Sequence, residues 1–130
     1  VLGGASQHKK MIKEYVKNKS IKVKVIVNAD NMAELMLKAD LAIGAGGTTS
    51  LERCCLGLPT LLYVLSENQK RIAENLVQLG AVMIVRNLEN DFQALVDDFS
   101  LWQFMSSKSQ SICDGLGTEK VVAHLGSLQK

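Results

Sequence analysis

Residues 40–53 read DLAIGAGGTTSLER, and this stretch decides how the rest of the chain is interpreted. Residues 41–43 form a short apolar run, which is typical of a strand buried on both faces. The following segment, residues 44–50, is called the glycine loop here. It holds three glycines in four positions, which permit positive φ and close approach of a ligand. Its two threonines and serine are favoured at helix N-caps, and a helical pattern through Leu51, Cys54, Cys55 and Leu58 follows. A strand, a glycine turn and a helix start together predict an anion site, most often for a phosphate.

The composition describes one ordinary globular domain. The chain has 130 residues, 47% of them apolar and 22% charged, and its net charge of +2 is too small for an electrostatic nucleic-acid binder. Seven lysines and one glutamate fall within residues 1–24. These lysines indicate either a solvated face or a basic rim turned toward a phosphate or a partner domain.

The residue inventory also limits the chemistry. Three cysteines without CxxC spacing predict a reduced, cytoplasmic setting, and no apolar run approaches the length of a membrane span. His8 and His124 lack ligand spacing, so we expect neither a metal nor a cofactor. Val1 falls inside what resembles the end of a strand, which suggests a piece of a longer protein.

Alternating patterns predict an α/β fold: a Rossmann-like parallel sheet of about five strands with helices on both faces. We expect strands at residues 1–2, 21–27, 41–43, 60–64 and 81–85. Helices are expected at 7–18, 32–39, 49–57, 66–80, 88–98, 101–113 and 118–128. Loops 28–32, 44–50 and 65–69 then lie at the carboxyl edge of the sheet, where such folds bind ligands.

Each candidate residue has a structural and a functional interpretation. The glycine loop fits neither the Walker pattern nor GxGxxG. Glu52 either closes a capping box with Thr49 or accepts both ribose hydroxyls of a nucleotide. Likewise, Ser66 and Gln69 form a second possible capping box, or the side chains at 67–69 bind sugar hydroxyls. The residues alone therefore predict a nucleotide-like ligand and no outstanding catalytic group.

Several motifs resemble those of the UDP-sugar hydrolases of pseudaminic acid biosynthesis and of the related spore-coat polysaccharide proteins. They are ADLAIGAGGTTSLERCCLGLP at 39–59, ENQ at 67–69, NMAELM at 31–36 and DGLG at 114–117. The hydrolases remove UDP from UDP-diacetamido-trideoxy-altropyranose and have a two-domain GT-B architecture. The resemblance implies that residues 1–130 are the C-terminal, UDP-sugar-binding domain of such an enzyme.

The resemblance also implies a role for each site residue. The diphosphate would be held by Gly46, Gly47, Thr48, Thr49 and Ser50, and the ribose by Glu52. The uracil would lie beside Asn31 and Met32, and the sugar or phosphate beside Glu67, Asn68 and Gln69.

The resemblance further implies parts that this sequence does not hold. The catalytic histidine would come from an absent N-terminal domain, so the partners expected are that domain and a UDP-sugar, and the chain alone would be inactive. The first βα unit of the C-terminal domain would also be missing, which leaves five strands in the order 2-1-3-4-5. Two alternatives stay open: the donor-binding domain of a GT-B glycosyltransferase, and a non-catalytic nucleotide-sugar-binding module.

Overall fold

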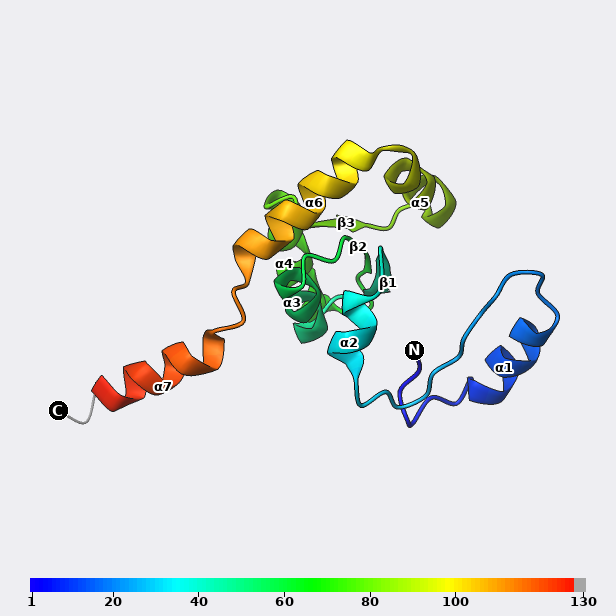
Figure 1. The fold of residues 1–130 in the computed structure, drawn as a ribbon, viewed down its shortest axis with the longest axis horizontal. Helices are drawn as coiled ribbons and strands as arrows, with labels where there is room; N and C mark the ends of the chain where they lie inside the picture. The colour runs from blue at the N-terminus through cyan, green and yellow to red at the C-terminus, as the bar shows by residue number, and fades with distance from the viewer. Residues whose placement is uncertain (128–130) are drawn as a thin grey trace. The chain divides into compact units, whose positions relative to one another are not determined.

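A parallel sheet of three strands is the centre of the computed structural model, which describes residues 1–127 (Figure 1). The chain divides into two compact units, Val1–Glu34 and Leu35–Lys130, and the sheet belongs to the second. The strands are β1 (Ala42–Ala45), β2 (Thr60–Tyr63) and β3 (Val82–Ile84), in the order β1-β2-β3. Register pairs Ala42 with Thr60 and Thr60 with Val82. Helices α3 (Thr48–Cys55) and α4 (Glu67–Gln78) make the two crossovers that parallel neighbours require.

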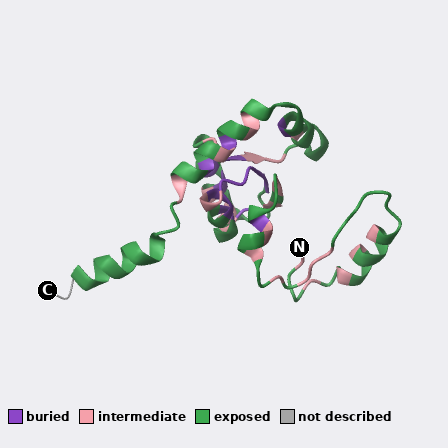
Figure 2. Ribbon diagram, in the orientation of Figure 1, coloured by how far each residue is buried: buried purple, intermediate pink, exposed green. Residues whose placement is uncertain are grey.

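Helices cover both faces of the sheet at its central strand, β2. The expectation of a strand buried on both faces at residues 41–43 is wrong, because β1 is an edge strand of the described sheet and Ile43 is 49% exposed. Adjacent β2 residues point to opposite faces, and both are fully buried: Leu62 lies in a cluster with residues of α3 and α4, and Leu61 lies with Leu95 and Met105. The last two residues come from α5 (Leu88–Asp97) and α6 (Phe99–Ile112). Figure 2 shows buried residues gathered around β2 and on the helices beside it. The core therefore fixes the carboxyl ends of β1 and β2 beside each other.

The remaining helices are α1 (Lys9–Lys17), α2 (Met32–Leu37) and α7 (Gly117–Ser127). All seven predicted helices are confirmed, with ends that differ by a few residues. Residue 128, the predicted end of the last helix, lies outside the described residues. Within residues 1–127, none of the helices combines the length and the hydrophobicity that crossing a bilayer needs.

The prediction of five strands is wrong for the described chain. Residues 1–2 and 21–27 supply only an isolated parallel bridge between Leu2 and Val27, in which Leu2 N donates to Ile26 O and Asn28 N to Leu2 O, both at 2.8 Å. In residues 21–24, Ile21 and Val23 alternate with lysines and are 70% and 42% exposed. A pair of strands without a third strand or a buried face is marginal in water, so the pairing stops after one bridge. The order of the three strands that do form agrees with the last three of the predicted order.

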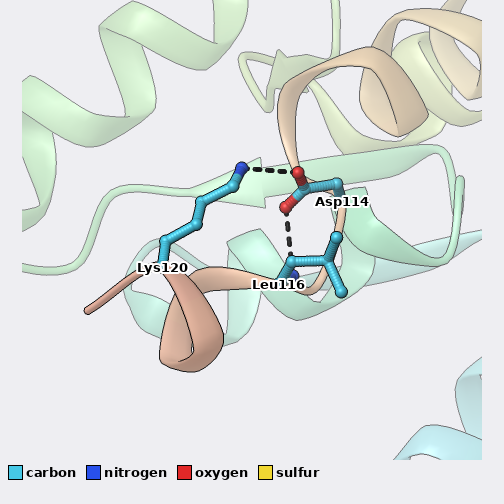
Figure 3. A network of polar contacts seen from close by, with 3 residues as sticks. All are labelled: Asp114, Leu116 and Lys120. Atoms are coloured by element: carbon cyan, nitrogen blue, oxygen red, sulfur yellow. Dashed lines mark hydrogen bonds and ion pairs between the residues drawn. The ribbon is translucent and has the colours of Figure 1, made fainter. Parts of the chain in front are cut away.

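A short polar network begins α7 (Figure 3). One Asp114 carboxylate oxygen accepts from Leu116 N at 3.0 Å, and the other pairs with Lys120 Nζ at 2.6 Å. The hydrogen bond from Lys120 and then the one from the Leu116 amide lower the pKa of Asp114. The DGLG motif at 114–117 thus has a local role at the start of a helix.

Candidate functional site

The glycine loop joins the carboxyl end of β1 to the first turn of α3. Gly47 occupies the N-cap position with φ 146° and ψ −169°, a conformation that is close to exclusive to glycine. The predicted caps, two threonines and a serine, lie instead inside the helix, and no side chain caps it. The start of α3 is therefore a helix end without a protein cap, which leaves its first N–H groups available.

Three consecutive amides at this helix end have no protein acceptor in the described chain: those of Gly47, Thr48 and Thr49. The amides on either side are already used. Gly46 N donates to Tyr63 O at 2.8 Å, which extends the pairing with β2, and Ser50 N donates to Gly47 O at 3.0 Å. Successive unpaired N–H groups at the positive end of a helix dipole are the elements of an anion site.

The three glycines of the loop have three different surroundings. A Cβ on Gly44 would lie 2.4 Å from Arg53 Nη1, and a Cβ on Gly46 would lie 3.3 Å from Gln69 Cβ. Gly47 has nothing within 4 Å of its Cβ position, so its backbone angle alone requires glycine. Space for a ligand, the reason expected from the sequence, is thus found at Gly47 and not at Gly44 or Gly46.

Arg53 is a site residue that the sequence analysis did not single out. Its side chain is 5% exposed and donates to Ala45 O at 2.8 Å, to Thr49 O at 3.2 Å and to Ser50 Oγ at 3.2 Å. The pKa of Arg53 is lowered chiefly by burial, an effect that nearby Cys54 and Glu52 oppose, and a guanidinium nevertheless stays charged at neutral pH. A positive charge therefore lies on the buried side of the glycine loop, in contact with its backbone.

The inward face of α3 differs from the predicted one. The buried residues are Ser50, Arg53 and Cys54, spaced i, i+3 and i+4, whereas Leu51 is 36% exposed. The spacing of Ser50, Arg53 and Cys54 along the helix could have indicated this buried face. It did not do so, because arginine is rarely buried and a serine gives no apolar signal.

The predicted diphosphate residues do not all face the same way. Thr48 and Thr49 are exposed, while Gly46 and the side chain of Ser50 are buried. Glu52 is exposed one turn into the helix, four residues after Thr48, and therefore lies on the same helix face as that threonine. The capping box proposed for Thr49 and Glu52 is wrong, because α3 begins at Thr48 with Gly47 as its N-cap.

The second loop at this edge contacts the first. Gln69 Cβ approaches Gly46, and Gln69 Oε1 accepts from Leu65 N at 3.1 Å. Ser66 is the N-cap of α4, but its hydroxyl donates to Asn68 Oδ1 at 2.5 Å instead of capping the helix, so this capping box is also wrong. Glu67 is exposed and pairs with Lys70 at 3.7 Å. The structure thus brings Gln69 against the glycine loop, and the roles expected for residues 67–69 stay predictions.

Asn31 and Met32 lie in the first unit of the chain, so their expected place beside the uracil stays a prediction. Asn31 Nδ2 donates to Glu34 Oε2 at 2.9 Å at the start of α2.

The described part of the second unit also contains cavities away from the glycine loop. One of about 390 Å³ lies among α4, β3 and α6, and one of about 400 Å³ lies among α5, α6 and the residues before β1. Their linings are mostly apolar and contain none of the unpaired amides of the glycine loop. Neither cavity therefore offers the anion-binding groups found at the glycine loop. Across residues 1–127, no group of three or more His, Cys, Asp or Glu side chains could hold a metal ion.

Comparison with known proteins finds a polysaccharide biosynthesis protein and N-acetylglucosamine transferases. Relatives include the spore coat polysaccharide biosynthesis protein SpsG of Bacillus subtilis, 28% identical over 98% of this chain and 40% of its own length. The UDP-N-acetylglucosamine–N-acetylmuramyl-(pentapeptide) pyrophosphoryl-undecaprenol N-acetylglucosamine transferase of Lactococcus lactis subsp. cremoris is 34% identical over 72% of this chain and 27% of its own. The enzyme of that name from Limosilactobacillus fermentum is 29% identical over 79% of this chain and 31% of its own. The chain thus spans well under half the length of these relatives.

The family match covers most of the chain. Residues 1–112 match the model of the glycosyltransferase family 28 C-terminal domain, a span that includes β1, β2, β3 and the glycine loop. A parallel sheet covered by helices is consistent with the Rossmann-like C-terminal domain of a GT-B protein. This chain belongs to the glycosyltransferase family 28 C-terminal domains.

Proposed function

We propose that this chain binds the UDP part of a nucleotide sugar, as the donor-binding domain of a GT-B glycosyltransferase acting in polysaccharide biosynthesis. The observation that carries the proposal is the run of three unpaired amides at Gly47, Thr48 and Thr49, at the carboxyl end of β1. The family match and the names of the relatives support it, since one relative is a UDP-N-acetylglucosamine transferase and another belongs to polysaccharide biosynthesis.

The diphosphate is assigned to the glycine loop. Unpaired N–H groups hydrogen-bond phosphate oxygens, and the dipole of α3 favours negative charge at this end. Arg53 adds a full positive charge from below the loop. Gly46 and Ser50 contribute by closing the loop on both sides, because their amides bond Tyr63 O and Gly47 O.

The ribose is assigned to Glu52. Its carboxylate lies one helical turn beyond the free amides, on the same exposed face as Thr48. An ionised carboxylate accepts several hydrogen bonds, so it can take both ribose hydroxyls of a nucleotide whose diphosphate sits at the helix end.

The sugar and the uracil are assigned to residues outside the glycine loop. Asn68 and Gln69 offer amide donors and acceptors to the sugar or the phosphates, and Glu67 lies beside them. Asn31 and Met32 are proposed to border the uracil.

The hydrolase activity expected from the resemblance is less well supported than transfer. The family description and the transferases among the relatives favour a glycosyltransferase, and none of these comparisons names a hydrolase. The two activities are separated in the whole enzyme by incubating a UDP-sugar with and without an acceptor. Transfer requires the acceptor, whereas UDP and free sugar released at full rate without it would favour the hydrolase. We expect residues 1–130 alone to bind UDP without turnover.

Calorimetric titration with UDP tests the binding proposal. Glu52→Ala should weaken binding by about 1–3 kcal/mol, the range for lost hydrogen bonds to a charged group. Glu74→Ala, which removes an exposed acid of α4, is the matched control and should leave the affinity unchanged. Equal affinities for the Glu52 variant and the native chain, with the fold intact by circular dichroism, would contradict the ribose assignment. Absence of UDP binding by the native chain would contradict the proposed function.

A further inference from the structure

The guanidinium of Arg53 connects the two ends of the glycine loop. Its Nη2 reaches Ala45 O at the end of β1, and its Nε reaches Thr49 O in the first turn of α3. The three unpaired amides lie on or between these two anchor points. Arg53 also donates to Ser50 Oγ, which leaves the serine hydroxyl proton free to bond elsewhere.

These contacts decide which backbone groups face a ligand. A carbonyl directed at a phosphate would repel it. The helix itself points the Thr49 carbonyl away from its N-terminal end, and the guanidinium engages the Ala45 carbonyl from the buried side of the loop. Arg53 comes from the helix itself, so one side chain sets the position of the strand end relative to the helix end. Its three hydrogen-bond acceptors are neutral oxygens, so no hydrogen-bonded carboxylate cancels its charge.

Gly44 provides independent support for this arrangement. Any side chain at this position would place its Cβ 2.4 Å from Arg53 Nη1, which is closer than real Cβ contacts. A side chain at position 44 would therefore have to displace the guanidinium.

We propose that Arg53 is the positioning residue of the glycine loop. It holds the amides of residues 47–49 in a binding arrangement before the ligand arrives, and the absence of a side chain at Gly44 leaves room for its guanidinium. The ligand part of this inference rests on the proposed function. Preorganised donors lose less entropy on binding, so the effect should be measured as affinity.

The experiment titrates UDP and inorganic pyrophosphate into Arg53→Met, Arg53→Lys and a control, Arg71→Met, which changes an exposed arginine of α4. We expect Arg53→Met to weaken both ligands roughly 10–100-fold, because charge and loop order are both lost. Arg53→Lys should be intermediate, since an ammonium keeps the charge without the planar fork. Arg71→Met should bind like the native chain.

A readout without ligand separates loop order from charge. In the free native chain, ¹⁵N relaxation should give order parameters near 0.85 for residues 47–49, and these values should fall in Arg53→Met while the strands keep theirs. Unchanged order in a folded Arg53→Met protein would overturn the positioning role. This readout still decides the matter if the native chain fails to bind UDP, an outcome that rejects the proposed function alone.

A double-mutant cycle tests the link to Gly44. Gly44→Ala should weaken UDP binding in the native background, because its Cβ displaces the guanidinium, and should add little in Arg53→Met. Equal effects of Gly44→Ala in both backgrounds would overturn the inference. If Arg53→Met does not fold, Gly44→Ala and Arg53→Lys are compared instead, and native-like affinity of both variants would overturn it.

Discussion

Gly47→Ala is the substitution whose effect follows most directly from the geometry of the loop. A Cβ at this position meets nothing within 4 Å, so no steric clash contributes. The whole effect comes from the backbone, whose φ of 146° and ψ of −169° fall in a region that alanine rarely occupies. Such a conformation costs about 1–3 kcal/mol for a residue with a side chain.

The substitution has two outcomes that depend on where the strain goes. If the loop keeps its shape, the free energy of unfolding falls by about 1–3 kcal/mol, and the melting temperature by roughly 3–6 °C per kcal/mol for a chain of this size. If the loop relaxes, stability recovers but the amides turn away, and UDP affinity falls instead. Either loss agrees with the reasoning.

The assay is thermal and urea unfolding followed by circular dichroism, together with UDP calorimetry on the same samples. Gly126→Ala is the matched control, because its Cβ site in α7 is also empty but its backbone is helical. Alanine in a helix is favoured over glycine, so the control should be unchanged or stabilised by up to about 1 kcal/mol. A Gly47→Ala protein with native stability and native UDP affinity would refute the assignment of a glycine-only backbone.

Three further predictions concern the scaffold. Leu61→Ala removes a fully buried β2 side chain between the sheet and two helices. It should lower the free energy of unfolding by about 2–5 kcal/mol in urea unfolding, and a loss below about 1 kcal/mol would contradict the described core. Trp102→Phe should cost about 1 kcal/mol in the same assay, because the indole N–H donates to Asp40 O at 2.7 Å, and no change would contradict that hydrogen bond. An NMR titration should give Asp114 a pKa below the ordinary aspartate value of about 3.9, because its hydrogen bond with Lys120 lowers that pKa. Since its folded pKa is depressed, the support it gives to α7 is present above the unfolded pKa and is lost as pH falls through the folded value, whereas Asp114→Asn should show no such titration.

The alternation of apolar runs and helical patterns predicted most of the second unit. The runs at 41–43, 60–64 and 81–85 became β1, β2 and β3. The central strand β2 is buried on both faces by helices that the same patterns predicted, whereas the edge strand β1 is only partly buried. The segment at 21–27 had the same local signal in its second half but formed one bridge, because a strand depends on neighbours that its own residues do not encode.

The strand-to-helix turn of the candidate site was predictable, and the contacts that build it were not. Three glycines between an apolar run and a helical pattern predicted the turn, because glycine tolerates backbone angles that other residues avoid. Spacing could not show that Gly46 N is taken by Tyr63 O, or that Gly44 makes room for Arg53, because both facts depend on contacts between elements. For the same reason the capping boxes were wrong: the true N-cap of α3 was set by the path of the glycine loop.

The central claim is that main-chain amides at the mouth of α3 hold the diphosphate of UDP. A ¹⁵N NMR titration tests it most directly, with UDP compared against uridine, which lacks phosphates. The account predicts that UDP shifts the amides of Gly47, Thr48 and Thr49 most strongly and that uridine leaves them nearly unchanged. Saturable UDP shifts centred on another part of the chain, such as the apolar cavity beside Phe104, would contradict it.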